Sequence, residues 1–97
     1  MKISEMQKKA YAIATEKGFY KKQREFGVWI ALIHSELSEA LEADRKGDSR
    51  GVAEELADVV IRVMGLCSIL EIDLETAIKR KMKINNSRPY LHEKRYG

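Results

Sequence analysis

Two pairs of acidic residues stand out because each lies within an otherwise apolar helical pattern. Glu36 and Glu39 form the first pair, and Glu55 and Asp58 form the second. A spacing of three residues places both members of a pair on one face of a helix. If the two helices fold back on each other across the short segment GDSRG, the four carboxylates converge at one depth of a helical bundle. Like charges at such close range resist joint ionisation, so the group needs a compensating cation.

The donor atoms of this cluster are all oxygens. Mg²⁺ and Mn²⁺ are hard divalent cations that prefer such ligands, so we expect the four acids to bind Mg²⁺, with Mn²⁺ as the alternative. A di-iron bundle would need Glu-x-x-His motifs. His34 precedes Glu36 by two residues, which places it on a different face of the helix. For any single acid, the simpler interpretation is a solvated side chain that pairs with lysine or arginine.

Four helices are predicted, because apolar residues recur with helical spacing in four segments. The predicted helices span about Ile3–Glu16, Arg24–Arg45, Arg50–Leu70 and Leu74–Asn86. Gly18 and Gly47 lie where the first two helices would end, and Asp73 is a favourable N-cap for the fourth. No segment is convincing as a strand. The fold class is therefore predicted to be all-α, a bundle-like arrangement of four helices.

Helical periodicity also separates the predicted core from surface that would contact another copy. The predicted core stripes include Met6, Ala10, Ile13, Ala14, Trp29, Ile33, Leu37, Leu41, Val52, Leu56, Val59, Val60, Val63 and Leu66. The apolar residues that lie off these stripes are Leu32, Ile61, Met64 and Ile69. Exposed apolar surface of this extent usually marks an interface. We therefore expect the helical faces to associate into a homodimer or a homotetramer.

Composition fits one small domain that spans residues 1–97, with 44% hydrophobic and 34% charged residues. The single cysteine, Cys67, allows no intrachain disulfide and is typical of a reducing compartment. The sequence shows no signal peptide and no apolar run close to the ~20 residues that a membrane span needs. We therefore expect a cytoplasmic protein without a membrane partner.

Charge is distributed unevenly along the chain. Residues 79–97 contain seven Lys or Arg and one acid, whereas residues 1–78 contain eleven basic and fourteen acidic residues. Residues 87–97 are predicted to form a basic irregular tail, because Pro89 stops the fourth helix. An acidic metal site beside a basic segment suits a polyanion that arrives with a metal ion. The alternative is a non-catalytic module that binds nucleic acid or regulates through the basic segment, which leaves the acidic pairs unexplained.

The two acidic motifs together resemble the MazG-like family of all-α nucleoside triphosphate pyrophosphohydrolases. The pattern is E-x-x-E, fifteen residues, then E-x-x-D. LIHSELSEALEA is similar to the family's first metal helix, and EELADVVIRV is similar to its second. The ending KMKINNSRPYLHEKRYG is similar to the family's C-terminal pattern, which falls here on Lys81, Asn85, Arg88, His92 and Lys94. Glu93 departs from this pattern, since many relatives carry glycine there.

The resemblance implies Mg²⁺-dependent hydrolysis of nucleoside triphosphates, with deoxynucleoside triphosphates first, to a monophosphate and pyrophosphate. It implies that all four acids bind the metal, and that Glu36 or Glu39 orients or deprotonates the attacking water. Lysine and arginine suit phosphate oxygens.

The substrate-binding residues that the resemblance implies are Lys81, Asn85, Arg88 and Lys94, and Trp29 is added to them from its position in the sequence. The first three are spaced as one face of the fourth helix. Trp29 lies two turns before Glu36 and is a candidate for stacking on the base, although a buried core tryptophan is the simpler interpretation.

Overall fold

The structure is a computed structural model that describes residues 1–90. It contains α1 (Ile3–Glu16), α2 (Phe26–Arg45), α3 (Ser49–Ile69) and α4 (Leu74–Ser87). No strand occurs in this part of the chain, so the all-α prediction is confirmed. Each helix begins and ends within two residues of its predicted position. None of the four is long and apolar enough to cross a lipid bilayer.

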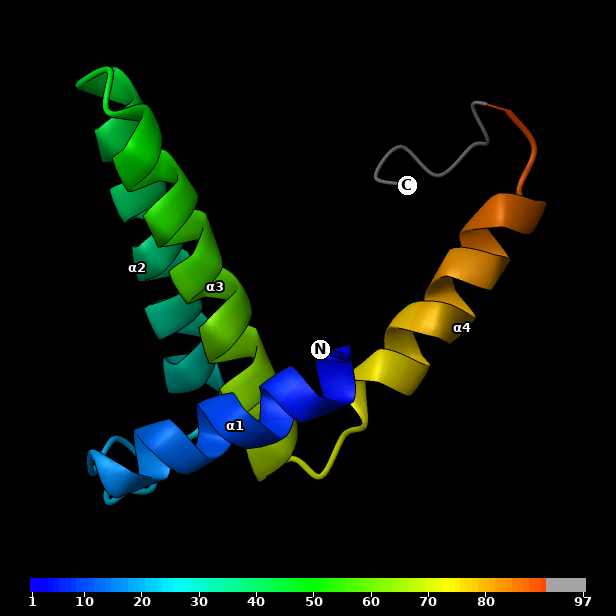
Figure 1. Cartoon of the computed structure of the whole chain (residues 1–97), viewed down its shortest axis with the longest axis horizontal. Coiled ribbons are helices and arrows are strands. Elements are labelled where there is room, and N and C mark those ends of the chain that lie inside the picture. Colours follow the sequence, from blue (N-terminus) through cyan, green and yellow to red (C-terminus); the bar gives the residue numbers. More distant parts are fainter. Residues whose placement is uncertain (91–97) are drawn as a thin grey trace.

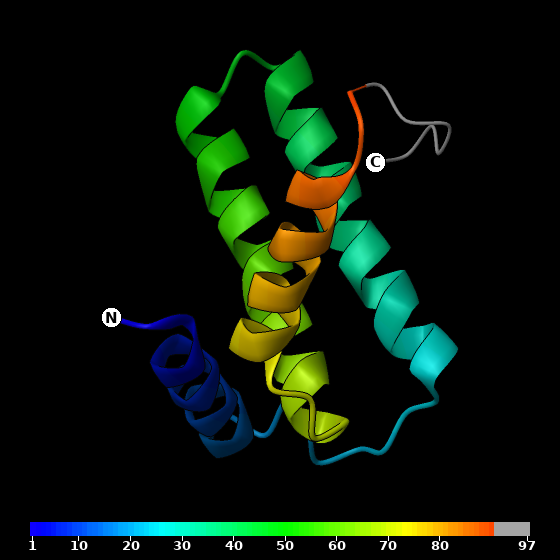
Figure 2. The same ribbon diagram turned by 90° about the vertical axis from the view of Figure 1, so that its right-hand side faces the viewer.

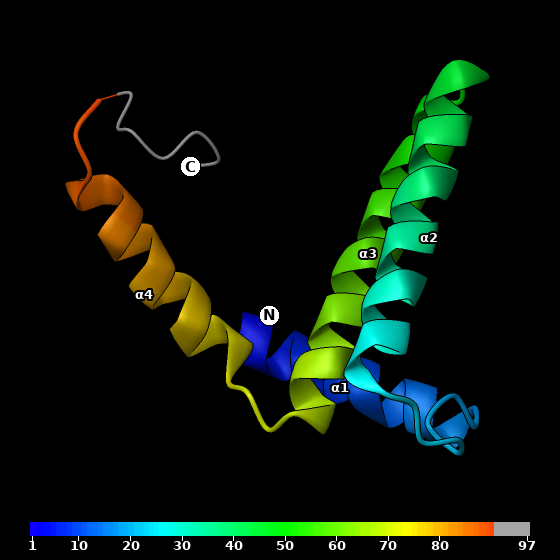
Figure 3. The same ribbon diagram turned by 180° about the vertical axis from the view of Figure 1, so that it is seen from behind.

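The helices α2 and α3 pair as an antiparallel hairpin (Figures 1 and 3). Gly47 has φ of 72°, a left-handed conformation that glycine adopts without steric strain. The side chain of Asp48 then accepts a hydrogen bond of 2.9 Å from the backbone N–H of Gly51, which caps the start of α3. The chain therefore reverses within a few residues, and α3 packs back along α2.

Aromatic side chains join α1 to the open end of this hairpin. Tyr20 stacks on Tyr11 of α1 with ring centroids 5.1 Å apart, and it lies 5.6 Å from the ring of Trp29 on α2. Gly65 permits this approach, because a Cβ atom there would collide with the Tyr20 hydroxyl. Figure 2 shows the connector between α1 and α2 running past the end of the hairpin opposite its turn. The start of α2 is thus fixed against both α1 and α3.

The position of α4 depends on Gln7, which is 8% exposed. Its amide nitrogen donates hydrogen bonds to Ser68 Oγ (3.2 Å) and to the Ile72 carbonyl (2.9 Å). Its amide oxygen accepts one from the Leu74 N–H (3.3 Å) at the start of α4. From this junction α4 runs away from the α2–α3 hairpin (Figures 1 and 3). The bundle-like packing is therefore carried by α1, α2 and α3.

Burial differs from the predicted core stripes. Met64 was predicted to lie off the core, and this is wrong, because it is 5% exposed and faces α1. Several members of the predicted stripes are instead 44–52% exposed: Met6, Ile13, Leu37, Leu41, Leu56 and Val60. With α4 directed away, no neighbour within the described chain covers them. An apolar groove of about 610 Å³ consequently lies open between α1 and α3. This groove is lined by Met1, Met6, Lys9, Ala10, Ile13, Ala14, Ala57, Val60, Ile61 and Met64.

Candidate metal centre

The hairpin brings the acids together because they are spaced equally from its turn. Glu39 and Glu55 each lie eight residues from Gly47, and Glu36 and Asp58 each lie eleven residues from it. In an antiparallel pair of helices, residues at equal distances from the turn lie at the same height. Carboxylate oxygens of Glu36, Glu39 and Glu55 accordingly lie within 4.8 Å of one another. Three of the four predicted ligands therefore meet at one place.

Asp58 lies beside this cluster and not within it. It is exposed, and it lines a pocket of about 220 Å³ together with Glu36. Its negative charge still acts on Glu55, three residues earlier on α3. The fourth predicted ligand thus contributes charge to the centre, while the structure leaves its carboxylate outside the tight group of three glutamates.

Glu55 is the acid of the cluster whose pKa is raised. Its Oε2 is buried and has no hydrogen-bond partner in the described chain. Desolvation first, then a hydrogen bond with Glu39 and the negative charges of Glu39, Glu36 and Asp58, together raise the pKa of Glu55 to about 7. A buried, unpaired carboxylate oxygen is unfavourable, and a hard divalent cation would satisfy it. The donor set therefore fits such an ion.

The raised pKa of Glu55 predicts how stability depends on pH without metal. The folded protein binds a proton with a pKa of about 7, whereas the usual value is 4.5. The contribution of this proton to the free energy of unfolding is therefore complete below pH 4.5, the usual pKa, and is lost as the pH rises through about 7. We expect the melting temperature in EDTA to fall between about pH 5 and pH 8. Because the ion replaces the proton, Mg²⁺ should raise the melting temperature more at pH 8 than at pH 5.

Calorimetry at several pH values, with EDTA and with Mg²⁺, measures this prediction. Glu55→Gln is the control, and it should remove most of the pH dependence in EDTA. The pKa values of Asp73 and Glu75 are lowered, chiefly by hydrogen bonds from Thr76 and Ser4, respectively. These two carboxyl groups therefore stay ionised throughout the tested pH range and do not contribute to the expected change in melting temperature. A melting temperature that does not fall in EDTA would show that the acids are not coupled as described.

Arg62 is a residue of the site that the sequence analysis missed. Its Nε donates a hydrogen bond of 2.9 Å to Glu36 Oε1, and the two side chains are 26% and 12% exposed. Its guanidinium also lies 4.9 Å from the centroid of the Phe19 ring. The signal was present, because Arg62 is the one charged residue between Val59 and Leu70. It also follows Asp58 by four residues, which places it on the same face of α3.

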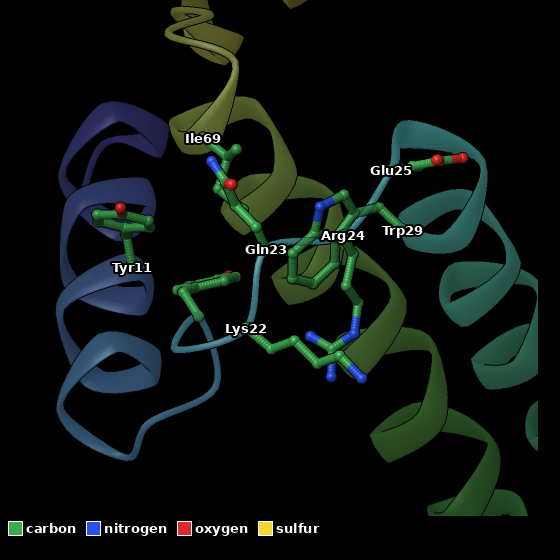
Figure 4. A pocket seen from close by; sticks show the side chains of 8 residues that line it. Tyr11, Lys22, Gln23, Arg24, Glu25, Trp29 and Ile69 are labelled. Atoms are coloured by element: carbon green, nitrogen blue, oxygen red, sulfur yellow. The ribbon is translucent and has the colours of Figure 1, made fainter.

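Trp29 lies two turns from Glu36, at a separate pocket of about 500 Å³ (Figure 4). It is 8% exposed, and the Arg24 guanidinium lies 5.0 Å from its ring. This pocket is lined by Tyr11, Tyr20, Lys22, Gln23, Arg24, Glu25, Trp29 and Ile69. In Figure 4 the carboxylate of Glu25 is directed away from the other side chains. Stacking of a base on Trp29 stays a prediction.

Of the predicted substrate-binding residues of the C-terminal segment, Lys81, Asn85 and Arg88 lie on or directly after α4 and do not join the acid cluster. Lys81 and Asn85 are exposed on α4, which runs away from the hairpin. Arg88 lies beyond the helix in extended conformation, with ψ of 145°, because the following Pro89 disfavours helical geometry. The prediction that Arg88 shares a helical face with Lys81 and Asn85 is therefore wrong. Its Nη1 is buried, and no hydrogen-bond partner for it occurs within residues 1–90. Lys94 and His92 lie outside the described residues.

The chain matches the model of a known protein family. A family model described as PRA-PH, phosphoribosyl-ATP pyrophosphohydrolase, matches residues 4–83. The matched segment contains α2 and α3 completely and all of α1 except Ile3, and with them the four acids and Arg62. No curated protein and no solved structure matched the chain.

Proposed function

The chain belongs to the phosphoribosyl-ATP pyrophosphohydrolase family, within the MazG-like all-α superfamily, and from this membership we propose that it hydrolyses a nucleoside triphosphate between the α and β phosphates. The products are the nucleoside monophosphate and pyrophosphate. Membership indicates a pyrophosphohydrolase, which favours an enzyme over a nucleic-acid-binding module. The MazG-like enzymes are typically dependent on a divalent metal.

One observation carries the proposal, which is the convergence of Glu36, Glu39 and Glu55 around an unpaired buried oxygen. These residues and Asp58 would hold Mg²⁺, with Mn²⁺ as the alternative. When bound, the ion neutralises phosphate oxygens and lowers the pKa of a bound water.

Glu36 and Glu39 are the candidates for accepting the proton of the attacking water. Arg62 fixes Glu36, and Glu39 is the more exposed of the two. Glu39 is therefore better placed to accept a proton from water that enters from solvent.

Two substrate classes follow from this proposal. Deoxynucleoside triphosphates are the first, as the resemblance to the MazG-like family implies. Phosphoribosyl-ATP, which the family description names, is the second. Both contain a triphosphate, so the same residues would act on the same phosphoanhydride bond in either compound. Contacts with the base and the sugar would decide between the two substrate classes. A pocket rejects a compound that leaves its buried polar groups without hydrogen-bond partners.

We also propose that the active unit is a homodimer, with a tetramer formed from two dimers as the alternative. The open groove between α1 and α3 exposes Met6, Ile13 and Val60, and a second copy would remove this apolar surface from water. The direction of α4 supports the same assembly. Lys81 and Arg88 do not lie at the acids of their own chain, and in a dimer the α4 of one chain would bring them to the acids of the other.

Product analysis tests the proposed function. A panel of the common nucleoside and deoxynucleoside triphosphates, with phosphoribosyl-ATP, is incubated with enzyme and Mg²⁺ and followed by phosphorus NMR. We expect monophosphate and pyrophosphate in equal amounts, and no turnover in EDTA. Reaction in ¹⁸O-labelled water should place the label on one product only. Diphosphate and orthophosphate as the initial products would contradict cleavage between the α and β phosphates.

A further inference from the structure

We propose that Arg62 binds the phosphate groups of the substrate directly beside the metal-binding acids. This role rests on the proposed function, and it gives the reaction a cation that belongs to the same helix as two of the acids. Arg62 follows Asp58 by one helical turn and Glu55 by two turns. It therefore occupies the next position along the face of α3 that carries the acids.

Two contacts hold the guanidinium in place. The Nε of Arg62 donates to Glu36 Oε1 at 2.9 Å, and the guanidinium carbon lies 4.9 Å from the Phe19 ring centroid. The Nε bond uses one of the five N–H groups of an arginine. The two terminal nitrogens make no hydrogen bond among residues 1–90, so four donors remain. A guanidinium that is oriented by one nitrogen and by stacking, with its other donors available, is suited to bidentate binding of phosphate.

The surroundings of Arg62 contain the space that a phosphate needs. Its side chain lines the pocket of about 220 Å³ that Glu36 and Asp58 also line. Phe19 and Tyr20 contribute the aromatic wall of this pocket. A group bound there would touch the guanidinium on one side and the metal-binding acids on the other.

Charge makes a cation necessary at this position. Glu36, Glu39, Glu55 and Asp58 carry up to four negative charges, and one divalent ion would compensate two of them. A polyphosphate would still be repelled by the remaining charge. Arg62 is the one basic residue that lines this pocket in the described part of the chain. Lys81 lies on α4 and does not line this pocket, so it does not supply that charge there.

A purely structural role explains the arrangement less well. Partly buried ion pairs are weak contributors to stability, because the desolvation of both charges offsets their attraction. The other described arginine–glutamate pairs, Arg45–Glu42 and Arg50–Glu54, lie at the surface with more than half of each side chain exposed. Arg62 is instead inserted into an apolar stretch of α3, one helical turn beyond Asp58.

Binding measurements with inorganic pyrophosphate test the proposal without turnover. Arg62→Met and Arg62→Lys are compared with wild type by calorimetric titration of pyrophosphate in Mg²⁺, and by titration of Mn²⁺ alone followed by electron paramagnetic resonance. We expect Arg62→Met to weaken pyrophosphate binding by about 10- to 100-fold, as loss of a charge-assisted hydrogen bond does. Arg62→Lys should weaken it less, because the charge remains while the planar fork is lost. The Mn²⁺ affinity should change by less than about threefold in either variant.

The matched control is Arg50→Met, which removes an arginine from the same helix where the side chain is 91% exposed. It should bind pyrophosphate and Mn²⁺ as wild type does. Unchanged pyrophosphate affinity in both Arg62 variants would overturn the proposal. A parallel loss of Mn²⁺ and pyrophosphate affinity would also overturn it, because Arg62 would then act by positioning Glu36. If circular dichroism shows that Arg62→Met does not fold, the same criteria apply to Arg62→Lys.

These outcomes are distinct from failure of the proposed function. The proposed function fails if wild-type protein releases no pyrophosphate from any member of the substrate panel. The role of Arg62 fails if wild-type protein binds pyrophosphate and the variants bind it equally well.

Discussion

Glu36→Gln and Asp58→Asn are each expected to reduce pyrophosphate release by about 100-fold or more, while the helical circular dichroism signal is retained. Each change removes one negative charge from the cluster and leaves the side-chain volume nearly unchanged. A metal ion that has lost a charged ligand is bound more weakly and is positioned less accurately, and both effects reduce turnover. This is the largest change that a single conservative substitution is expected to cause in the protein.

Steady-state pyrophosphate release at saturating Mg²⁺ measures this effect. Glu42→Gln is the matched control, since Glu42 lies one turn beyond Glu39 on α2 and its side chain is 59% exposed. The control should keep wild-type activity. Glu36→Gln also removes the partner of Arg62, whereas Asp58→Asn does not, so a comparable loss in both variants points to the metal. Wild-type turnover in either variant would refute the assignment of that residue.

Ile13→Asp is expected to convert an active dimer into an inactive monomer. Ile13 is 51% exposed, and it lines the open groove between α1 and α3. In a monomer an aspartate at this position would be solvated, so the fold should persist. In a dimer it would be buried against apolar side chains without a partner, which is strongly unfavourable. Activity should fall with the dimer, because Lys81 and Arg88 would no longer reach the acids of a second chain.

Light scattering coupled to size-exclusion chromatography measures the change. Wild-type protein should elute with at least twice the monomer mass of 11.1 kDa, and Ile13→Asp with the monomer mass. Ala12→Asp is the control, because Ala12 is exposed on the same helix and does not line the groove. It adds the same charge and should leave the dimer intact. An active wild-type species with the mass of the monomer would end the dimer proposal.

The features that the sequence predicted well are those that local interactions determine. The helix boundaries follow from apolar periodicity and from turn and capping residues such as Gly47, Asp48 and Asp73. The convergence of Glu36, Glu39 and Glu55 needed one further assumption, which was that the helices on both sides of Gly47 fold back on each other. A short turn between two long amphipathic helices makes this the favoured arrangement.

The features that the sequence did not predict depend on which neighbour covers each helix face. Periodicity identifies an apolar face, but it does not say whether the chain itself or another molecule buries it. Met64, which lies off the predicted core stripes, is buried against α1, while Leu37 and Val60, which lie on those stripes, remain about half exposed. The extended conformation of Arg88, in contrast, depends on a local interaction. Proline disfavours helical geometry in the residue before it, so the sequence Arg88-Pro89 was sufficient to predict this conformation.

The equal spacing of the acids about Gly47 has a consequence for how the gene can tolerate insertions. Each added residue within a helix rotates everything beyond it by about 100° and shifts it by ~1.5 Å. One codon inserted between Glu39 and Gly47 would therefore turn Glu36 and Glu39 away from Glu55. Codons added inside the turn itself lengthen a solvent-exposed loop, for which closure becomes only slowly less favourable with length. The relative positions of the acids thus depend on the number of residues in the helical segments between them and the turn, whereas the length of the turn itself can vary.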